Sequence, residues 1–201
     1  MGLFFLKIQT LLFPVSSKGG DKWGIVTLIN ILKYTTQQRN DVLMDPVKIP
    51  KMPKAEYDAL IKRQYVSRIA FGACEHPYIA PVMYVFDGKY LYFLSTKYGR
   101  KMEYFNSSPK VSVEIEEYAP DLSSFTFVSL QGFLEEVKDP LQKKKVREQF
   151  VGMIVKNRLS PRVLTALGHN PNDNPDVLVR EERSLVWKLV GVKDIVALKN
   201  G

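Results

Sequence analysis

The sequence predicts a mainly β protein, a small antiparallel barrel with accessory helices. Several stretches between residues 65 and 137 alternate apolar and polar side chains, which is typical of strands with one buried face. The turn pair Asp87-Gly88 lies between two of them and indicates a β-hairpin. The order of elements is a helix, three strands, a short helix, two strands, a helical segment and a closing strand. Six antiparallel strands joined by hairpins favour a closed or partly closed barrel.

The individual elements follow from local patterns. Proline near the start, early acidic residues and late basic residues predict a first helix over residues 53–63. Strands are expected at 65–73, 78–86, 89–94, 111–117 and 125–137, and helices at 140–155 and 159–167. Residues 184–198 are expected to form a strand pair or one long bent strand. Gly132, within the fifth strand, indicates a bend or a close backbone approach. Both histidines, His76 and His169, are expected in exposed loops.

Residues 1–51 differ from the rest and form a poorly defined N-terminal extension, whereas residues 52–201 form the barrel domain. The apolar run at 3–15 is interrupted by polar residues and is too short to span a bilayer. It also lacks the features of a secretory signal. The extension fits a loosely attached segment, a membrane-surface contact, or a misassigned start with Met44 or Met52 as the initiator. We favour the misassigned start.

Composition limits the classes of function. The single cysteine, Cys74, excludes an intramolecular disulfide and a cysteine-based metal cluster, and it fits a reducing, cytoplasmic location. Two histidines are too few for a histidine-rich metal site, and we expect no metal. The net charge of +8 suits an anionic partner, but its lysines are scattered rather than gathered in a stripe. We therefore expect no specific nucleic-acid partner and favour small phosphorylated ligands.

The stretch from Tyr90 to Lys101 carries the strongest indication of a site. Its first half reads as a strand, and its second half supplies two hydroxyls, a glycine and three cations before a short helix. Free N–H groups at a helix start, hydroxyl donors and basic side chains together suit an anion, phosphate above all. A polar turn with solvated charges explains the composition equally well.

Five pieces of the sequence resemble, in order and spacing, the FMN-binding split barrels related to pyridoxamine 5′-phosphate oxidase, including their nitroimidazole-resistance branch. The pieces begin at Arg68 (RIAF), Pro77 (PYIAPVMYVFDG), Leu91 (LYFLSTKYGRK), Asn106 (NSSPKVSVEI) and Val128 (VSLQG). The resemblance covers residues 52–199. It implies a six-stranded antiparallel split barrel that forms a homodimer with FMN at the subunit interface.

The resemblance also implies roles for particular residues. Ser95, Thr96, Arg100 and Lys101 would hold the FMN phosphate, and Arg68 would reach the same end of the cofactor. Pro81, Val82 and Met83 would lie along the isoalloxazine ring, and Gln131 would bond the ring or the ribityl hydroxyls. Trp187 of the other subunit would cover the ring. Taken alone, Trp187 is more often a core residue, and Arg68 fits a structural ion pair.

The implied activity is that of an FMN-dependent oxidoreductase, which moves electrons from a nicotinamide-type donor to a small acceptor. Such chemistry resides in the flavin, so no catalytic side chain is assigned. An F420-dependent reductase and a non-catalytic flavin- or haem-binding module are the alternatives. Many nitroimidazole-resistance relatives carry histidine where this chain has Leu94. The C-terminus lacks the arginine-containing ending with which pyridoxamine phosphate oxidases bind their substrate, so pyridoxamine 5′-phosphate is not the expected substrate.

Overall fold

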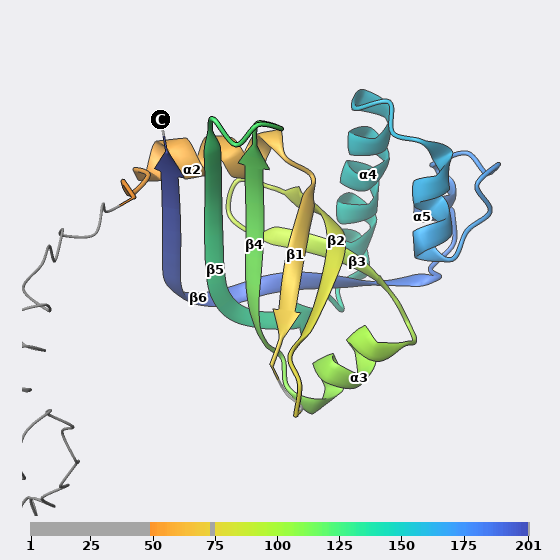
Figure 1. Ribbon diagram of the computed structural model, residues 1–201. Coiled ribbons are helices and arrows are strands. Elements are labelled where there is room, and N and C mark those ends of the chain that lie inside the picture. Colours follow the sequence, from red (N-terminus) through yellow and green to blue (C-terminus); the bar gives the residue numbers. More distant parts are fainter. Residues whose placement is uncertain (1–48, 73–74, 201) are drawn as a thin grey trace, which may run out of the picture. The chain divides into compact units, whose positions relative to one another are not determined.

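The structure is a computed structural model that describes residues 49–72 and 75–200. Six antiparallel strands form a closed barrel in the order β1-β2-β3-β6-β5-β4 (Figure 1). The strands are β1 (Val66–Phe71), β2 (Tyr78–Phe86), β3 (Leu91–Thr96), β4 (Lys110–Tyr118), β5 (Phe125–Glu136) and β6 (Ser184–Asn200). The predicted fold class is confirmed. The expectations for residues 1–48 lie outside the described residues.

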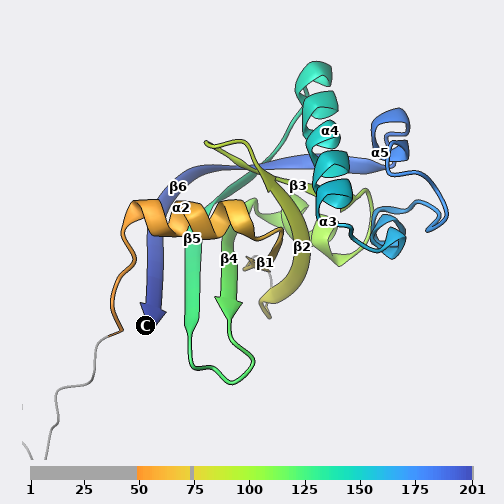
Figure 2. The ribbon, with the colours of Figure 1, turned by 90° about the horizontal axis from the view of Figure 1, so that it is seen from above.

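Two short helices lie at opposite ends of the barrel. Helix α2 (Lys54–Arg63) crosses the ends of β4, β5 and β6 and buries Leu60 and Ile61 against the barrel interior (Figure 2). Helix α3 (Arg100–Ser107) lies at the other end, beside the last residues of β1 (Figure 1). The chain before α2 also pairs with the barrel, because Lys51 bridges to Leu198.

The interior of the barrel is filled by alternate residues of every strand. On β1 the residues Ser67, Ile69 and Phe71 are buried, and the intervening residues are more exposed, as the alternation predicts. Strand β4 follows the same rule, with Val113 and Ile115 completely buried. The outward residues of β1, β4 and β5, together with the exposed Ile79 of β2 and Val196 of β6, form an open face.

Strand β6 is one long bent strand rather than a strand pair. It pairs first with β3 and then, over most of its length, with β5. Gly191 has a positive φ of 57° at the bend, a conformation that glycine adopts without strain. The pairing of β5 with β6 shifts between Gln131 and Phe133, and a Cβ at Gly132 would lie 2.7 Å from the Val190 carbonyl oxygen. The close backbone approach predicted at Gly132 is confirmed.

A helical segment covers the outer face of β2, β3 and the start of β6. It consists of α4 (Pro140–Lys156), the 3-10 helix η1 (Pro161–Leu167) and α5 (Val177–Arg180). The Asp139 carboxylate accepts a hydrogen bond from the Gln142 N–H at 2.8 Å and caps α4. Phe150, Leu164 and Leu178 pack on outward residues of the strands and form a second apolar core. The short helix α5 was not predicted, because four residues are too few to show a helical period.

No helix within residues 49–72 and 75–200 is long and apolar enough to cross a membrane.

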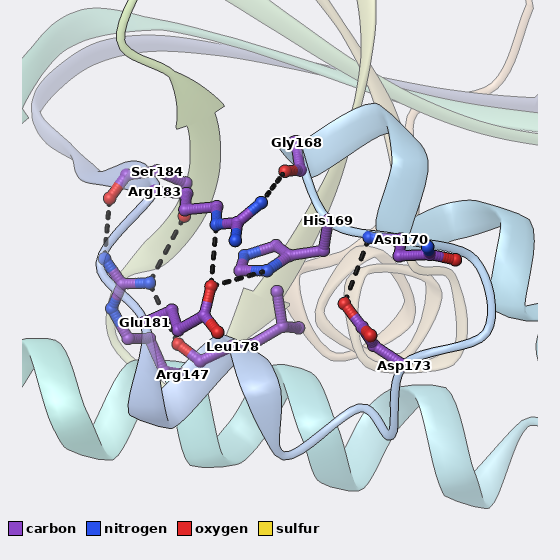
Figure 3. Close-up of polar contacts among 9 residues, drawn as sticks. All are labelled: Arg147, Gly168, His169, Asn170, Asp173, Leu178, Glu181, Arg183 and Ser184. Atoms are coloured by element: carbon purple, nitrogen blue, oxygen red, sulfur yellow. Dashed lines mark hydrogen bonds and ion pairs between the residues drawn. The ribbon is translucent and has the colours of Figure 1, made fainter.

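A buried arginine anchors this helical segment to the barrel (Figure 3). Arg147 of α4 is 2% exposed, and its guanidinium donates to the Leu178 carbonyl at 3.0 Å and to the Ser184 carbonyl at 2.6 Å. It also donates to the Ser184 hydroxyl at 3.3 Å. Ser184 is the first residue of β6 and pairs with Thr96 of β3. One side chain therefore connects α4, α5 and the start of β6, which pairs with the end of β3.

The prediction that His169 lies in an exposed loop is wrong, whereas His76 is exposed as predicted. The His169 imidazole is fully buried, with no hydrogen-bond partner in the described part of the chain. Its Nδ1 lies 3.8 Å from the Glu181 carboxylate, which is 2.7 Å from Arg183 Nε (Figure 3). Burial lowers the pKa of His169 below 6.5, and the positive charges of Arg183 and Arg147 lower it further. The carboxylates of Glu181 and Asp173 oppose this shift.

We expect Arg147→Ala to lower the free energy of unfolding by about 2–4 kcal/mol, because it leaves buried carbonyl groups without donors. Lys144→Ala, on the same helix with a side chain 65% exposed, should change it by less than about 0.5 kcal/mol. Urea denaturation monitored by circular dichroism measures both. Equal losses in the two variants would contradict the anchoring role of Arg147.

His169 gives the stability a defined pH dependence. Its pKa is lower in the folded chain than in the unfolded chain, so below about pH 6.5 the unfolded chain binds more protons and stability falls. The loss continues until the folded histidine itself is protonated. We expect the wild type to lose more stability than His169→Gln between about pH 7 and pH 5, by up to ~1.4 kcal/mol per pH unit. Urea titrations at both pH values test this, with His76→Gln, at a side chain 87% exposed, as the control that follows the wild type.

Candidate functional site

Strands β2 and β3 part shortly after the hairpin that joins them. They are paired only from Tyr84 with Phe93 to Phe86 with Leu91. Within the described residues, β2 from Tyr78 to Met83 has no partner strand on this side, because β3 continues along β6 instead. The Tyr84 N–H bonds toward β1, so by the alternation of an antiparallel ladder the Pro81 carbonyl points to the unpaired edge. This edge offers backbone groups to a ligand.

The residues that connect β3 to α3 lie on the other side of the opening where β2 and β3 separate. Gly99 precedes α3 with a positive φ of 88°, and no side chain caps the helix. The first N–H groups of α3, those of Arg100 and Lys101, have no intrahelical acceptor. Tyr104 holds the helix in place, because its hydroxyl donates to the His76 carbonyl at 2.9 Å. The predicted helix start is thus present and open to an anion.

The cations of this junction have no acidic partner in the described part of the chain. None of Lys97, Arg100 and Lys101 forms an ion pair within the described residues, although ten ion pairs between other residues are present there. Lys101 is partly buried, and this desolvation lowers its pKa. The Arg100 guanidinium lies 5.7 Å from the centre of the Tyr78 ring, at the start of the unpaired edge. A desolvated, unpaired lysine is costly, and a bound anion would relieve that cost.

The two predicted hydroxyl ligands are less available than the cations. Ser95 is completely buried, and its hydroxyl donates to the Thr96 carbonyl at 3.1 Å. The Thr96 hydroxyl donates to the Tyr98 carbonyl at 3.0 Å and lies nearer the surface. In this conformation the Ser95 hydroxyl is buried and bonded within its own strand, and its contact with a phosphate stays a prediction. Its place on the inward row of β3 explains the burial.

Arg68 and the β2 stretch lie next to each other but differ in orientation. Arg68 pairs in register with Pro81, and both face outward. The Arg68 guanidinium forms an ion pair with Glu116 of β4, the structural role already considered for it. Val82 points into the barrel core, and Met83 packs against the second apolar core. From this stretch, only backbone groups and the exposed face of Pro81 are open to a ligand.

Gln131 lies on the open face of the sheet, away from the β3–α3 junction. The outward register row across four strands is Ala70 (β1), Ser112 (β4), Gln131 (β5) and Asp194 (β6). A pocket of about 410 Å³ lies beside Gln131. It is also lined by Ala70, Phe71, Gly72, Pro77, Lys110, Val111, Ser112, Gly132, Phe133 and Lys193. The sequence does not indicate that Lys110 and Lys193 line one pocket, because the cross-strand register that brings them together is not visible in a single strand.

Trp187 lies inside the barrel and not on its surface, and its contact with a cofactor stays a prediction. Its indole is completely buried inside its own barrel, 5.0 Å from the Phe105 ring and 6.4 Å from the Phe71 ring, measured between ring centres. The inward row of β6 places it there. Its Nε1 has no hydrogen-bond partner in the described residues.

The barrel with parted strands and an uncapped helix beside them defines the class of the split-barrel proteins. A family model described as pyridoxamine 5′-phosphate oxidase matches residues 53–174, more than half of the chain. The chain therefore belongs to the pyridoxamine 5′-phosphate oxidase family. An uncharacterised protein of Rhizobium meliloti (strain 1021) is 34% identical over 68 residues, which are 34% of this chain and 44% of that protein. The chain thus matches less than half of the length of this relative.

Solved structures share the fold at low sequence identity. A FAD-binding protein from Mesorhizobium loti has a TM-score of 0.55 at 20% identity, covering 76% of this chain and 99% of its own. A putative 5-nitroimidazole antibiotic resistance protein from Bacteroides thetaiotaomicron has a TM-score of 0.53 at 17% identity, covering 76% and 90%. The haem storage protein HutZ from Vibrio cholerae has a TM-score of 0.51 at 13% identity, covering 72% and 94%. These likenesses concern the fold.

Proposed function

We propose that this chain is an FMN-dependent oxidoreductase that passes electrons from a nicotinamide-type donor to a small acceptor. Its membership of the family and the FAD-binding protein that shares its fold support a flavin cofactor. The observation that carries the proposal is the β3–α3 junction, where an uncapped helix start meets a partly buried lysine without an acidic partner in the described residues. A terminal phosphate fits this junction better than a neutral group.

The rest of the parting fits the elongated shape of a flavin mononucleotide. With the phosphate at the α3 start, the ring would extend along the unpaired edge of β2, where the Pro81 carbonyl can accept a hydrogen bond. The flavin, when bound, supplies the hydride or electron transfer. The chain's own part is to hold the phosphate with Arg100 and Lys101, to orient the ring on β2 and to exclude water.

A homodimer completes this proposal. Gln131 lies on the open face of the sheet and not at the β3–α3 junction, so one subunit does not gather all the predicted contacts. The open face also carries exposed apolar side chains, including Val66 at 46%, Ile79 at 61% and Val196 at 41%. Apolar groups gathered on one face favour association. A second copy seated there would bring its Gln131 toward the cofactor of the first.

The phosphate assignment is tested by the double variant Arg100→Ala/Lys101→Ala. Removing two cations from a phosphate site should lower the fraction of protein that retains FMN about tenfold or more, with the fold unchanged. The visible absorption of the purified protein, relative to its protein absorption, measures this fraction, and circular dichroism verifies the fold.

The matched control is Lys89→Ala/Lys138→Ala, which removes the same charge from exposed positions away from the junction. It should retain the flavin of the wild type. If the junction variant retains as much flavin as this control, the phosphate does not lie at the start of α3.

The dimer is tested by Ile79→Lys, which places a charge on the open face. We expect the wild type to have the mass of two chains in light scattering and the variant to have the mass of one, with less retained flavin. Val155→Lys, at a side chain 63% exposed on the helix-covered side, should remain dimeric. A wild type that is monomeric at micromolar concentration would refute the proposed interface.

A further inference from the structure

The pocket beside Gln131 owes its existence to small residues at neighbouring positions. Ala70 on β1 and Ser112 on β4 are register partners on the outward row, and Gly72 follows the end of β1. Longer side chains at these places would fill the depression. Gly132 lines the pocket with its backbone, because a Cβ there would point into the barrel, toward the Val190 carbonyl and Leu189. The pocket is therefore a direct consequence of the sequence at these positions.

The walls of the pocket combine an apolar surface with two cations. Phe133 and Pro77 provide apolar contact, and the Lys193 ammonium lies 5.4 Å from the centre of the Phe133 ring. Lys110 of β4, the register partner of Phe133, also lines the pocket. Neither lysine forms an ion pair with a carboxylate of the described residues. Asp194 is the register partner of Gln131 but does not line the pocket.

We propose that this pocket binds the substrate and that the substrate is a small planar molecule with a negative charge, of the aromatic carboxylate class. A ring placed against Phe133 and Pro77 removes apolar surface from water, while Lys110 and Lys193 neutralise the carboxylate. The Gln131 amide and the Ser112 hydroxyl supply hydrogen bonds that orient it. The assignment to the substrate rests on the proposed function, since Gln131 would then lie beside the flavin of the partner copy.

The test measures the binding of 2-naphthoate and of its neutral analogue 2-naphthamide to the purified full-length protein by isothermal titration calorimetry. We expect the carboxylate to bind at least about tenfold more tightly than the amide, and more weakly as salt is added. Lys110→Gln/Lys193→Gln should weaken naphthoate binding about tenfold and leave naphthamide binding nearly unchanged. Ala70→Trp should abolish the binding of both by filling the depression.

Two matched controls exclude general effects. Val155→Trp adds the same side chain on α4, outside the pocket and away from the open face, and Lys89→Gln/Lys138→Gln removes the same charge elsewhere. Both should bind naphthoate as the wild type does. Equal affinity for the acid and the amide, or naphthoate binding that survives Ala70→Trp, would overturn the proposal.

Flavin content, measured on the same samples, separates this proposal from the function proposed above. A protein that retains flavin but binds naphthoate equally in the wild type and Lys110→Gln/Lys193→Gln disproves the pocket alone. If the protein contains no flavin but shows the expected binding pattern, the proposed oxidoreductase function is disproved. The ligand class proposed for the pocket then still stands. Naphthoate that binds only after flavin is removed would show that the pocket belongs to the flavin, and would overturn its assignment to the substrate.

Discussion

The parting of β2 from β3 is the constraint on which the rest of this structure depends. The hairpin is held at its turn by the Asp87 carboxylate, which accepts hydrogen bonds from the N–H groups of Lys89 and Tyr90. After three register pairs β3 leaves β2 and continues along β6, which leaves one edge of β2 unpaired among the described residues. The same departure directs the chain into α3. An open strand edge and an open helix start thus come to face one another as a consequence of strand pairing.

The helical segment packs on the outer face of β2, β3 and the start of β6, where β2 and β3 share only three register pairs. Arg147 links α4 to Ser184, and Ser184 pairs with Thr96 at the end of β3. The position of the β3–α3 junction is therefore supported from behind by a buried, hydrogen-bonded arginine. Loss of this guanidinium would leave the buried carbonyl groups of Leu178 and Ser184 without a donor, which destabilises strongly. The fold thereby fixes the backbone that would carry the phosphate.

Much of this structure was predictable because the periods in the sequence are clear. The alternation in 65–71, 78–86 and 111–117 determined which residues fill the barrel, and Asp87-Gly88 located the hairpin. The bend of β6 was expected only as one of two possibilities. His169 was misjudged, because its neighbours Asn170 and Pro171 are typical of exposed loops, and the burial comes from packing against α4 and α5. Such packing leaves no local signal.

In the candidate site, too, features formed by residues adjacent in the chain were predictable, and features formed by strand pairing were not. The glycine and the cations at 97–101 follow one another in the chain, so the sequence indicated an anion site there. Strand register places the side chains of Ser95 and Trp187 inside the barrel, which their residue types alone do not indicate. Lys110 and Lys193 are distant in sequence and meet only through the pairing of β4 with β5 and of β5 with β6. A lysine at position 110 or at position 193 does not by itself indicate that the two side chains line one pocket.

The identity of the bound cofactor tests the central claim most directly. The purified protein should show the visible absorption of a flavin, denaturation should release a molecule with the mass of FMN, and NADH or NADPH should bleach the colour. A released deazaflavin or haem would contradict the assignment of FMN. A colourless protein that binds no added FMN would contradict the flavin account altogether.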